Sequence, residues 1–188
     1  MTVATDTATG VIGACERLKT EEGGRYEPPT VVVLSSSSTS ETLDAAPKLV
    51  HWLVETALNY TYADLRRAEG VYFALHEKTK RGKESPLMNV IFTKPGGFVP
   101  PIEKGKPTGY ELSTEKVSTM VSYADLGIGM VEMGERWEEL GLGWKDVSVN
   151  ATGKVKFDSW DKAKILSNGI LANWAPRLWE IGRRRGWW

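Results

Sequence analysis

The 188-residue chain has only one cysteine, Cys15, and only two histidines. A lone cysteine excludes a disulfide within the chain, and so few nitrogen and sulfur ligands argue against a structural zinc site. We therefore predict no disulfide and no bound metal. The scarcity of cysteine also fits a reducing compartment, so the sequence predicts a cytoplasmic protein.

The chain also lacks an excess of charge of either sign, because 24 basic residues balance 24 acidic residues. A balanced surface has no general attraction for nucleic acid, and we expect no nucleic-acid partner. No run of residues approaches the roughly 20 apolar positions that a membrane-spanning helix needs. The first residues have neither the basic start nor the continuous apolar core of a signal peptide. These absences indicate a globular domain, long enough to build one hydrophobic core.

Helical and strand patterns alternate along the first half of the sequence. Small and apolar residues recur at helical spacing over 3–20, and the glycine and proline pairs at 23–24 and 28–29 end that helix. The β-branched run at 30–34, TVVVL, is typical of a strand buried on both faces. Residues 48–80 then predict one long helix or two.

The same alternation continues in the second half. Residues 88–98, MNVIFTKPGGF, predict a second buried strand that its own Pro-Gly-Gly turn stops, and residues 99–109 predict a loop. Ser122 and Asp125 match a capping box that opens a helix, with Ser122 as the N-cap and Asp125 reaching back. Residues 145–155 predict a third strand. This order favours an α/β fold with three parallel strands, right-handed crossovers and helices on both faces.

Four consecutive serines follow the first strand directly. In an open α/β sheet the chemistry lies at the carboxyl ends of the strands, although a plain polar loop would give the same pattern. Tyr62 lies on the helix after Ser37, and Arg66 lies one helical turn further on the same face. Such a serine, tyrosine and cation can polarise a carbonyl group and pass it a proton. The alternative is a surface tyrosine beside an ion pair of Arg66 with Asp64 or Glu69.

The end of the second strand supplies another candidate. Pro95, Gly96 and Gly97 form a turn there that carries almost no side-chain atoms. Backbone without side chains lets a flat ligand approach closely. We therefore expect this turn to lie against a ligand.

Six segments together resemble the C-terminal half of a short-chain dehydrogenase/reductase, most of all the extended and atypical members that include NmrA-like and fungal NAD(P)-binding proteins. They are TDTATGVIGACERLK, VVVLSSSS, YADLR, NVIFTKPGGF, VSYADLGIGMVEM and VNATGKVKF, and they span residues 5–157. The resemblance implies an α/β, partial Rossmann-like three-layer sandwich with a short, mainly parallel sheet over residues 1–157. Residues 158–188 would follow as a C-terminal helical segment rich in tryptophan and arginine.

The resemblance also implies roles for the candidate residues. The catalytic serine of the family would be Ser37 or its neighbour Ser36, and the family's Tyr-x-x-x-Lys pair would be Tyr62 and Arg66. The cofactor would be NAD(P), with the proline-glycine loop near its nicotinamide. The residues contacting it would be Ser36, Pro95, Gly96, Gly97 and Phe98. The ancestral chemistry would be the reduction or oxidation of a small carbonyl or alcohol substrate.

Two features depart from the family pattern. Arg66 stands in place of the lysine, and its bulkier guanidinium does not hold a ribose hydroxyl in the same way. The Gly-x-Gly-x-x-Gly turn that binds the pyrophosphate has no counterpart, so we expect the first half of the fold to be missing and NAD(P) binding to suffer. Two alternatives stay open: a non-catalytic, NmrA-like binding or regulatory module, and a truncated remnant without cofactor binding.

Two further expectations concern surfaces. Without the first half of the fold, the TVVVL strand becomes a sheet edge, where a second copy can pair to form a homodimer. The C-terminal segment combines tryptophans with the arginines at 183–185. We expect its tryptophans to cover an exposed sheet face, and contact with a membrane surface is the less favoured interpretation.

Overall fold

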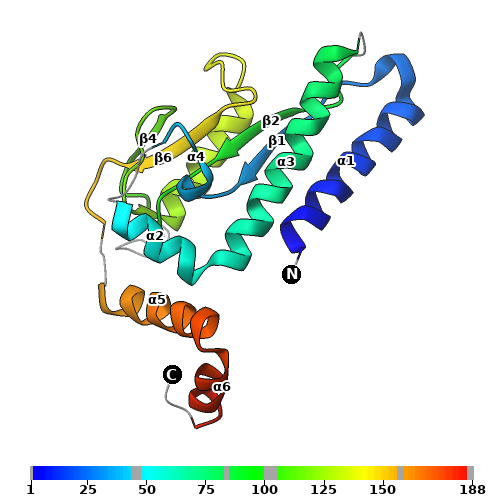
Figure 1. Cartoon of the computed structure of the whole chain (residues 1–188). Helices are drawn as coiled ribbons and strands as arrows, with labels where there is room; N and C mark the ends of the chain where they lie inside the picture. Colours follow the sequence, from blue (N-terminus) through cyan, green and yellow to red (C-terminus); the bar gives the residue numbers. More distant parts are fainter. Residues whose placement is uncertain (1, 44–47, 83–84, 100–105, 156–158, 186–188) are drawn as a thin grey trace.

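The computed structural model describes residues 2–43, 48–82, 85–99, 106–155 and 159–185, and Figure 1 shows how they are arranged. A four-stranded sheet with the order β1-β2-β6-β4 forms its centre. The chain is therefore an α/β protein, as the sequence predicts.

Three of the four strands are those that the sequence predicts, and they run parallel to one another. β1 (Thr30–Leu34) pairs with β2 (Asn89–Thr93), and β2 pairs with β6 (Asp146–Ala151). β1 pairs only with β2 in the described part of the chain, so it is an edge of the sheet. The prediction of an exposed edge at TVVVL is correct on this point.

The fourth strand, β4 (Tyr110–Ser113), was not predicted, and it pairs antiparallel with β6 at the opposite edge. A second, very short parallel ladder joins β3 (Phe98–Val99) to β5 (Val121–Ser122). The predicted loop at 99–109 therefore begins inside a strand, and residues 100–105 lie outside the described part. Short strands of this kind depend on a partner far away in the sequence, which local patterns do not reveal.

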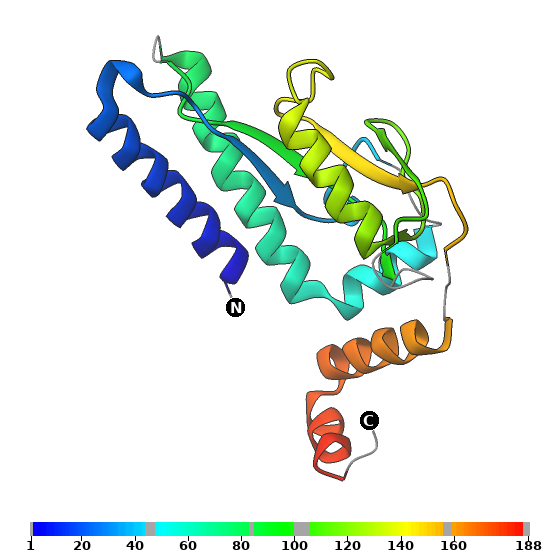
Figure 2. The same ribbon diagram turned by 180° about the vertical axis from the view of Figure 1, so that it is seen from behind.

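Helices cover both faces of the sheet, which gives three layers. α1 (Val3–Glu22) and α3 (Asn59–Arg81) lie side by side on one face, and α4 (Tyr123–Glu135) lies on the other (Figures 1 and 2). Successive residues of β2 point to opposite faces, as in any strand. Val90 and Phe92 join the core under α1 and α3, whereas Ile91 joins the core under α4.

The N-terminus of α1 is held by a side chain of α3. The carboxylate of Asp64 accepts hydrogen bonds from the backbone N–H groups of Ala4, at 2.8 Å, and Thr5, at 3.3 Å. The Thr5 hydroxyl donates a third bond to it at 2.6 Å. The Thr5 hydrogen bond is the main reason why the pKa of Asp64 lies below its ordinary value. Asp64 thereby satisfies donors that a helix N-terminus leaves unpaired.

The capping residue of α4 is Ser122, as predicted, and its hydroxyl accepts the backbone N–H of Asp125 at 3.0 Å. The fully buried Asp125 carboxylate accepts the hydroxyls of Ser122, at 2.5 Å, and Thr108, at 2.6 Å. The backbone N–H groups of Thr108 and Gly109 donate to it as well. Burial acts to raise the pKa of Asp125, but these hydrogen bonds outweigh it and hold the pKa below its ordinary value.

Residues 48–80 form two helices, which settles the alternative that the sequence leaves open. α2 (Lys48–Ala57) ends just before Leu58, and α3 begins directly after Leu58 in a new direction. α5 (Ser159–Trp174) and α6 (Pro176–Arg184) follow the sheet domain, and α5 packs against α2. The expectation that the C-terminal tryptophans cover the sheet is therefore wrong for the described ones, because the helices dock on α2 and project away from the strands (Figure 1).

Candidate active site

The serines after β1 lie at the carboxyl end of the sheet, where they form a tight turn. Ser35, Ser36 and Ser37 are all buried, and residues Ser37–Thr39 form one turn of 3₁₀ helix. The Ser36 hydroxyl caps this turn by accepting the N–H of Ser38 at 3.3 Å. Hydroxyls held in a buried turn at a strand end form a positioned polar site rather than a solvated loop.

Of the two candidate serines, Ser36 faces the candidate tyrosine. Its Oγ lies 3.5 Å from the phenolic oxygen of Tyr62, and both residues are buried. Ser37 instead donates its backbone N–H to the carbonyl of Pro95 at 3.0 Å. The Ser36–Tyr62 separation is at the long end for a hydrogen bond, as catalytic pairs often are before substrate binds.

The third candidate, Arg66, lies one turn beyond Tyr62 on α3 and is bound by a residue that the sequence did not suggest. Its guanidinium forms an ion pair with Glu55 of α2, and its Nη2 donates to the carbonyl of Ser38 at 3.4 Å. Neither Asp64 nor Glu69 is its partner. Arg66 thus connects α2, α3 and the serine turn, with half of its side chain exposed to solvent.

The Pro95–Gly97 turn lies beside the serine turn, since the N–H of Ser35 donates to the carbonyl of Thr93 at 2.8 Å and Ser37 donates to Pro95. The structure explains why glycine stands at positions 96 and 97, because neighbouring residues of the chain pack closely against both. A Cβ on Gly96 would lie 2.8 Å from the carbonyl oxygen of Thr119, which is closer than real Cβ contacts. Gly97 is similarly crowded by the Met120 sulfur.

Phe98 begins β3, and its ring lies 5.6 Å from the ring of Tyr123. Residues 118–120 therefore occupy the space beside the Cα atoms of both glycines, and the contact of this turn with a flat ligand stays a prediction. What the turn does offer is a fixed position for the carbonyl of Pro95, which holds the serine turn in place.

A buried network of charges lies next to this site, and the sequence analysis missed it. Lys94 Nζ lies 3.0 Å from Glu69 Oε2 and 3.3 Å from Asp146 Oδ2. Only 2% of the Lys94 side chain and 9% of the Glu69 side chain are exposed. Lys94 is the sequence feature that could have revealed this network, because a lysine between an apolar strand and a proline has little access to solvent.

Hydroxyl groups complete this network. Glu69 accepts the hydroxyls of Ser35 and Thr39, and the Ser40 hydroxyl donates to Asp146 at 2.5 Å. Glu69 and Tyr62 are seven residues apart on α3, so they lie on the same helix face. The network therefore fixes α3, and with it Tyr62, against the ends of β1, β2 and β6.

A cavity of about 570 Å³ among the described residues is lined by the charged network and by Phe73 and Trp144. Another, of about 680 Å³, lies between β4 and α4, where the Tyr110 hydroxyl donates to Glu132 at 2.8 Å. Burial, together with that hydrogen bond, raises the pKa of Tyr110. Neither cavity is lined by Ser36 or Tyr62.

The described residues contain no group of three or more histidine, cysteine or acidic side chains placed to hold a metal ion. None of their helices is long and apolar enough to cross a bilayer.

Comparison with known proteins finds relatives among fungal oxidoreductases. Averufin oxidase A of Aspergillus flavus is 32% identical over 184 residues, which is 95% of this chain and 59% of that protein. Oxidoreductase aflX of Aspergillus parasiticus is 31% identical over 176 residues, covering 93% of this chain and 60% of the relative. Oxidoreductase stcQ of Emericella nidulans is 30% identical over 176 residues. The chain thus spans about three fifths of the length of the curated relatives it matches, and no family model matches it.

Two solved structures resemble the fold. Both are short-chain dehydrogenase/reductases from Veillonella parvula, each 16% identical to this chain. The first has a TM-score of 0.58 and covers 84% of this chain and 65% of that one. The second, in complex with NADP, has a TM-score of 0.52 and covers 80% of this chain and 63% of that one. The fold is therefore of the Rossmann-like kind found in short-chain dehydrogenase/reductases.

Proposed function

We propose that this chain is the catalytic half of an NAD(P)-dependent oxidoreductase of the short-chain dehydrogenase/reductase type, acting on a small carbonyl or alcohol. The observation that carries the proposal is the buried pair of Ser36 Oγ and Tyr62 OH, 3.5 Å apart at the carboxyl end of a parallel sheet. The names of the relatives and the fold of the solved structures support the same reaction class.

The two hydroxyls have complementary roles in carbonyl reduction. A substrate carbonyl oxygen between them accepts a hydrogen bond from Ser36 and the proton from Tyr62. Loss of that proton leaves a phenolate, which a nearby cation favours. Arg66, one helical turn away, is the candidate for this cation, and it would have to act while paired with Glu55. In the alcohol-oxidising direction the same groups act in reverse, with Tyr62 as the base.

NAD(P) is the cofactor that the proposed reaction implies. Ser36 and Tyr62 would hold the carbonyl, and a nicotinamide beside them would supply or accept the hydride at the carbonyl carbon. The described residues contain no glycine-rich turn between a strand and a helix N-terminus, which is what a pyrophosphate needs. We propose that the pyrophosphate is held by polypeptide that corresponds to the part of the relatives this chain does not cover.

A chimera tests the activity. The chain replaces the segment of averufin oxidase A that it matches, and oxidation of NADPH is followed with a panel of small aldehydes, ketones and quinones. We expect turnover that Tyr62→Phe reduces by about a hundredfold or more, because proton transfer by a positioned side chain contributes 10²–10⁴ in rate. Tyr60→Phe is the control, since Tyr60 is mostly exposed on the same helix. Activity that Tyr62→Phe leaves unchanged would contradict the catalytic assignment.

One observation favours a second candidate, the non-catalytic binding or regulatory module of NmrA-like type. Arg66 occupies the position of the family's lysine, and its guanidinium binds Glu55 and the Ser38 carbonyl instead of standing open beside Tyr62. A module of this kind would bind a dinucleotide in the chimera without turnover of any substrate. Dinucleotide binding measured beside the activity assay separates the two candidates.

A further inference from the structure

The C-terminal helices α5 and α6 present a row of apolar side chains to solvent. Trp174 is the last residue of α5, and Leu178 and Ile181 lie three residues apart on one face of α6, after the break at Ala175. Their exposed fractions are 68%, 60% and 44%. The neighbouring face of α6 packs inward, because Gly182 is buried and Trp179 is partly buried.

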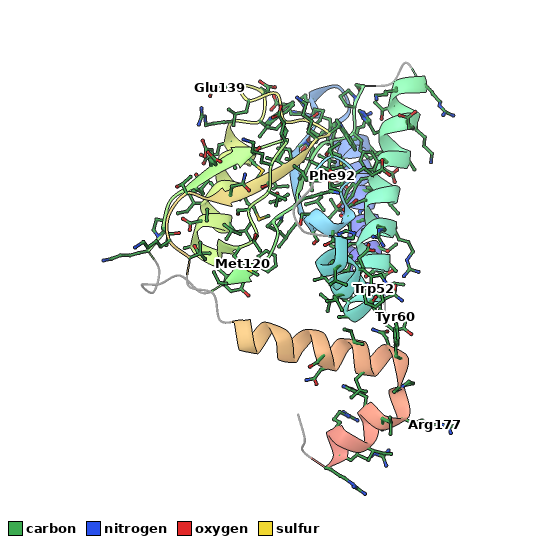
Figure 3. The ribbon with its side chains drawn as sticks, turned by 60° about the vertical axis from the view of Figure 1, so that its left-hand side comes forward. Trp52, Tyr60, Phe92, Met120, Glu139 and Arg177 are labelled. Atoms are coloured by element: carbon green, nitrogen blue, oxygen red, sulfur yellow. The ribbon has the colours of Figure 1, made fainter. Side chains whose placement is uncertain are left out.

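The row continues onto α2. The rings of Trp52 and Trp174 meet edge to face, with centroids 6.1 Å apart. Leu49 lies one turn before Trp52, and these two residues are 67% and 49% exposed. Figure 3 shows Trp52 beside the α5–α6 segment and Arg177 on its outer side. We call Leu49, Trp52, Trp174, Leu178 and Ile181 the apolar row.

The apolar row is held in place by a built junction between α2 and α5. Gly169 packs directly on the backbone of Ala57, where a Cβ would lie within 3.0 Å of the carbonyl carbon. The side-chain amide of Asn173 donates to the carbonyls of Thr56 and Gly169, at 2.8 and 2.9 Å. The row is thus a positioned surface of the folded chain.

Positive charge flanks the row. Arg177 and Arg184 are seven residues apart, so they lie on a common helix face next to Leu178 and Ile181. Arg183 and Arg184 share a single acidic partner, Glu180, at 3.2 and 3.0 Å. With three arginines and one glutamate, α6 carries a net positive charge.

We propose that the apolar row binds the surface of a bilayer that contains acidic phospholipids. A short helix with an apolar face and arginines at its flank lies in the plane of the headgroups, with the apolar side chains below them and the guanidinium groups at the phosphates. Trp52 and Trp174 on the adjoining helices add the aromatic side chains that favour this interface. A second copy of the chain is a poorer occupant, because it brings the same positive charge to the contact.

Vesicle sedimentation with the full chain tests the proposal. We expect binding to vesicles of phosphatidylcholine mixed with phosphatidylserine, and much weaker binding to phosphatidylcholine alone. Leu178→Glu should lower the partition coefficient at least tenfold. The pair Arg177→Glu and Arg184→Glu should lower it by roughly fivefold for each arginine removed, because each basic residue near an acidic surface contributes about that factor.

Matched controls test whether vesicle binding depends on the apolar row and its arginines or on any exposed apolar or basic side chain. Val131→Glu places the same charge at an equally exposed apolar position on α4, where 59% of the residue is exposed. Lys80→Glu with Arg81→Glu makes the same charge change at exposed positions on α3. Both controls should bind vesicles like the parent chain. Absence of sedimentation, equal binding to both vesicle types, or equal loss in the controls would overturn the proposal. Self-association in light scattering that Leu178→Glu abolishes would overturn it too, in favour of a contact between copies.

Discussion

Lys94 and Glu69 form an ion pair of 3.0 Å between the end of β2 and the middle of α3, with less than a tenth of either side chain exposed. Asp146 at the start of β6 is the second acidic neighbour of the lysine. A buried charge is tolerated only when it is paired and hydrogen-bonded, and here both conditions are met. The pair therefore joins three strand ends to the helix that carries Tyr62.

Removing one partner of this pair should strongly destabilise the fold. Lys94→Ala leaves Glu69 buried without its cation, and we expect a loss of about 3–5 kcal/mol in the free energy of unfolding, measured by urea denaturation. Lys94→Met with Glu69→Gln removes both charges and should cost less than Lys94→Ala alone. The exposed pair of Arg136 and Glu139 is the control, and Arg136→Ala should destabilise the chain far less than Lys94→Ala. Equal losses at the two sites would contradict the structural role of the buried pair.

Acid should destabilise the chain through Asp64 and Asp125. Hydrogen bonds hold the pKa of each carboxyl below its ordinary value in the folded state. The unfolded chain then binds more protons below about pH 4, so the stability these groups contribute is present above that pH and is lost as the pH falls toward the folded-state pKa. Thermal melts from neutral pH down to about pH 3 measure the loss. Asp125→Asn should reduce the fall in melting temperature between neutral pH and about pH 3. An unchanged fall would show that other groups cause it.

The chain alone should bind NADPH poorly. Among the described residues no turn provides the backbone N–H groups and helix N-terminus that a pyrophosphate needs. Calorimetric titration of the purified chain should therefore give no saturable heat. A micromolar dissociation constant would refute this expectation and would show that other residues cradle the phosphates.

Substitutions of Ser36 and Ser37 should have different effects on the kcat of the chimera. Ser36→Ala removes the hydroxyl that faces Tyr62, and we expect a loss of about 10²–10³ in kcat, as for other groups that donate to a developing oxyanion. Ser37→Ala keeps the backbone contact to Pro95 and should change kcat little. The reverse order of effects would return the role to Ser37.

The open edge of β1 should pair with a second copy. The N–H of Ser35 points toward β2, where it donates to Thr93, so the N–H of Leu34 points away from the sheet. An unpaired edge of this kind invites strand addition. We expect a dimer in light scattering, and Leu34→Pro should convert it to a monomer because it removes one outward donor and no bond to β2. A monomeric parent chain would contradict edge pairing.

The main architecture could be predicted because its signals are local. The β-branched runs of β1 and β2 and the Ser122 cap of α4 each lie within a few residues of sequence. β4 could not be predicted, because its four residues form a strand only by pairing with β6, some 40 residues later.

The candidate active site, too, could be predicted only in part from the sequence. Spacing brought Tyr62 and the serines together correctly, yet it could not choose between Ser36 and Ser37, because the sharp turn after β1 decides which hydroxyl faces the tyrosine. The partners of Arg66 and Glu69 come from α2 and β2. Pairings across the fold of this kind leave no periodic trace in the sequence.

The break at Leu58 sets the angle at which α2, with α5 docked on it, meets α3. Glu55 lies on the α2 side of the break and Arg66 on the α3 side, so their ion pair spans it. Tyr62 and Ser36 are positioned separately, because the Glu69–Lys94 pair anchors α3 to the strands. The position of the cation therefore depends on how α2 docks, whereas the positions of the two hydroxyls depend on the sheet.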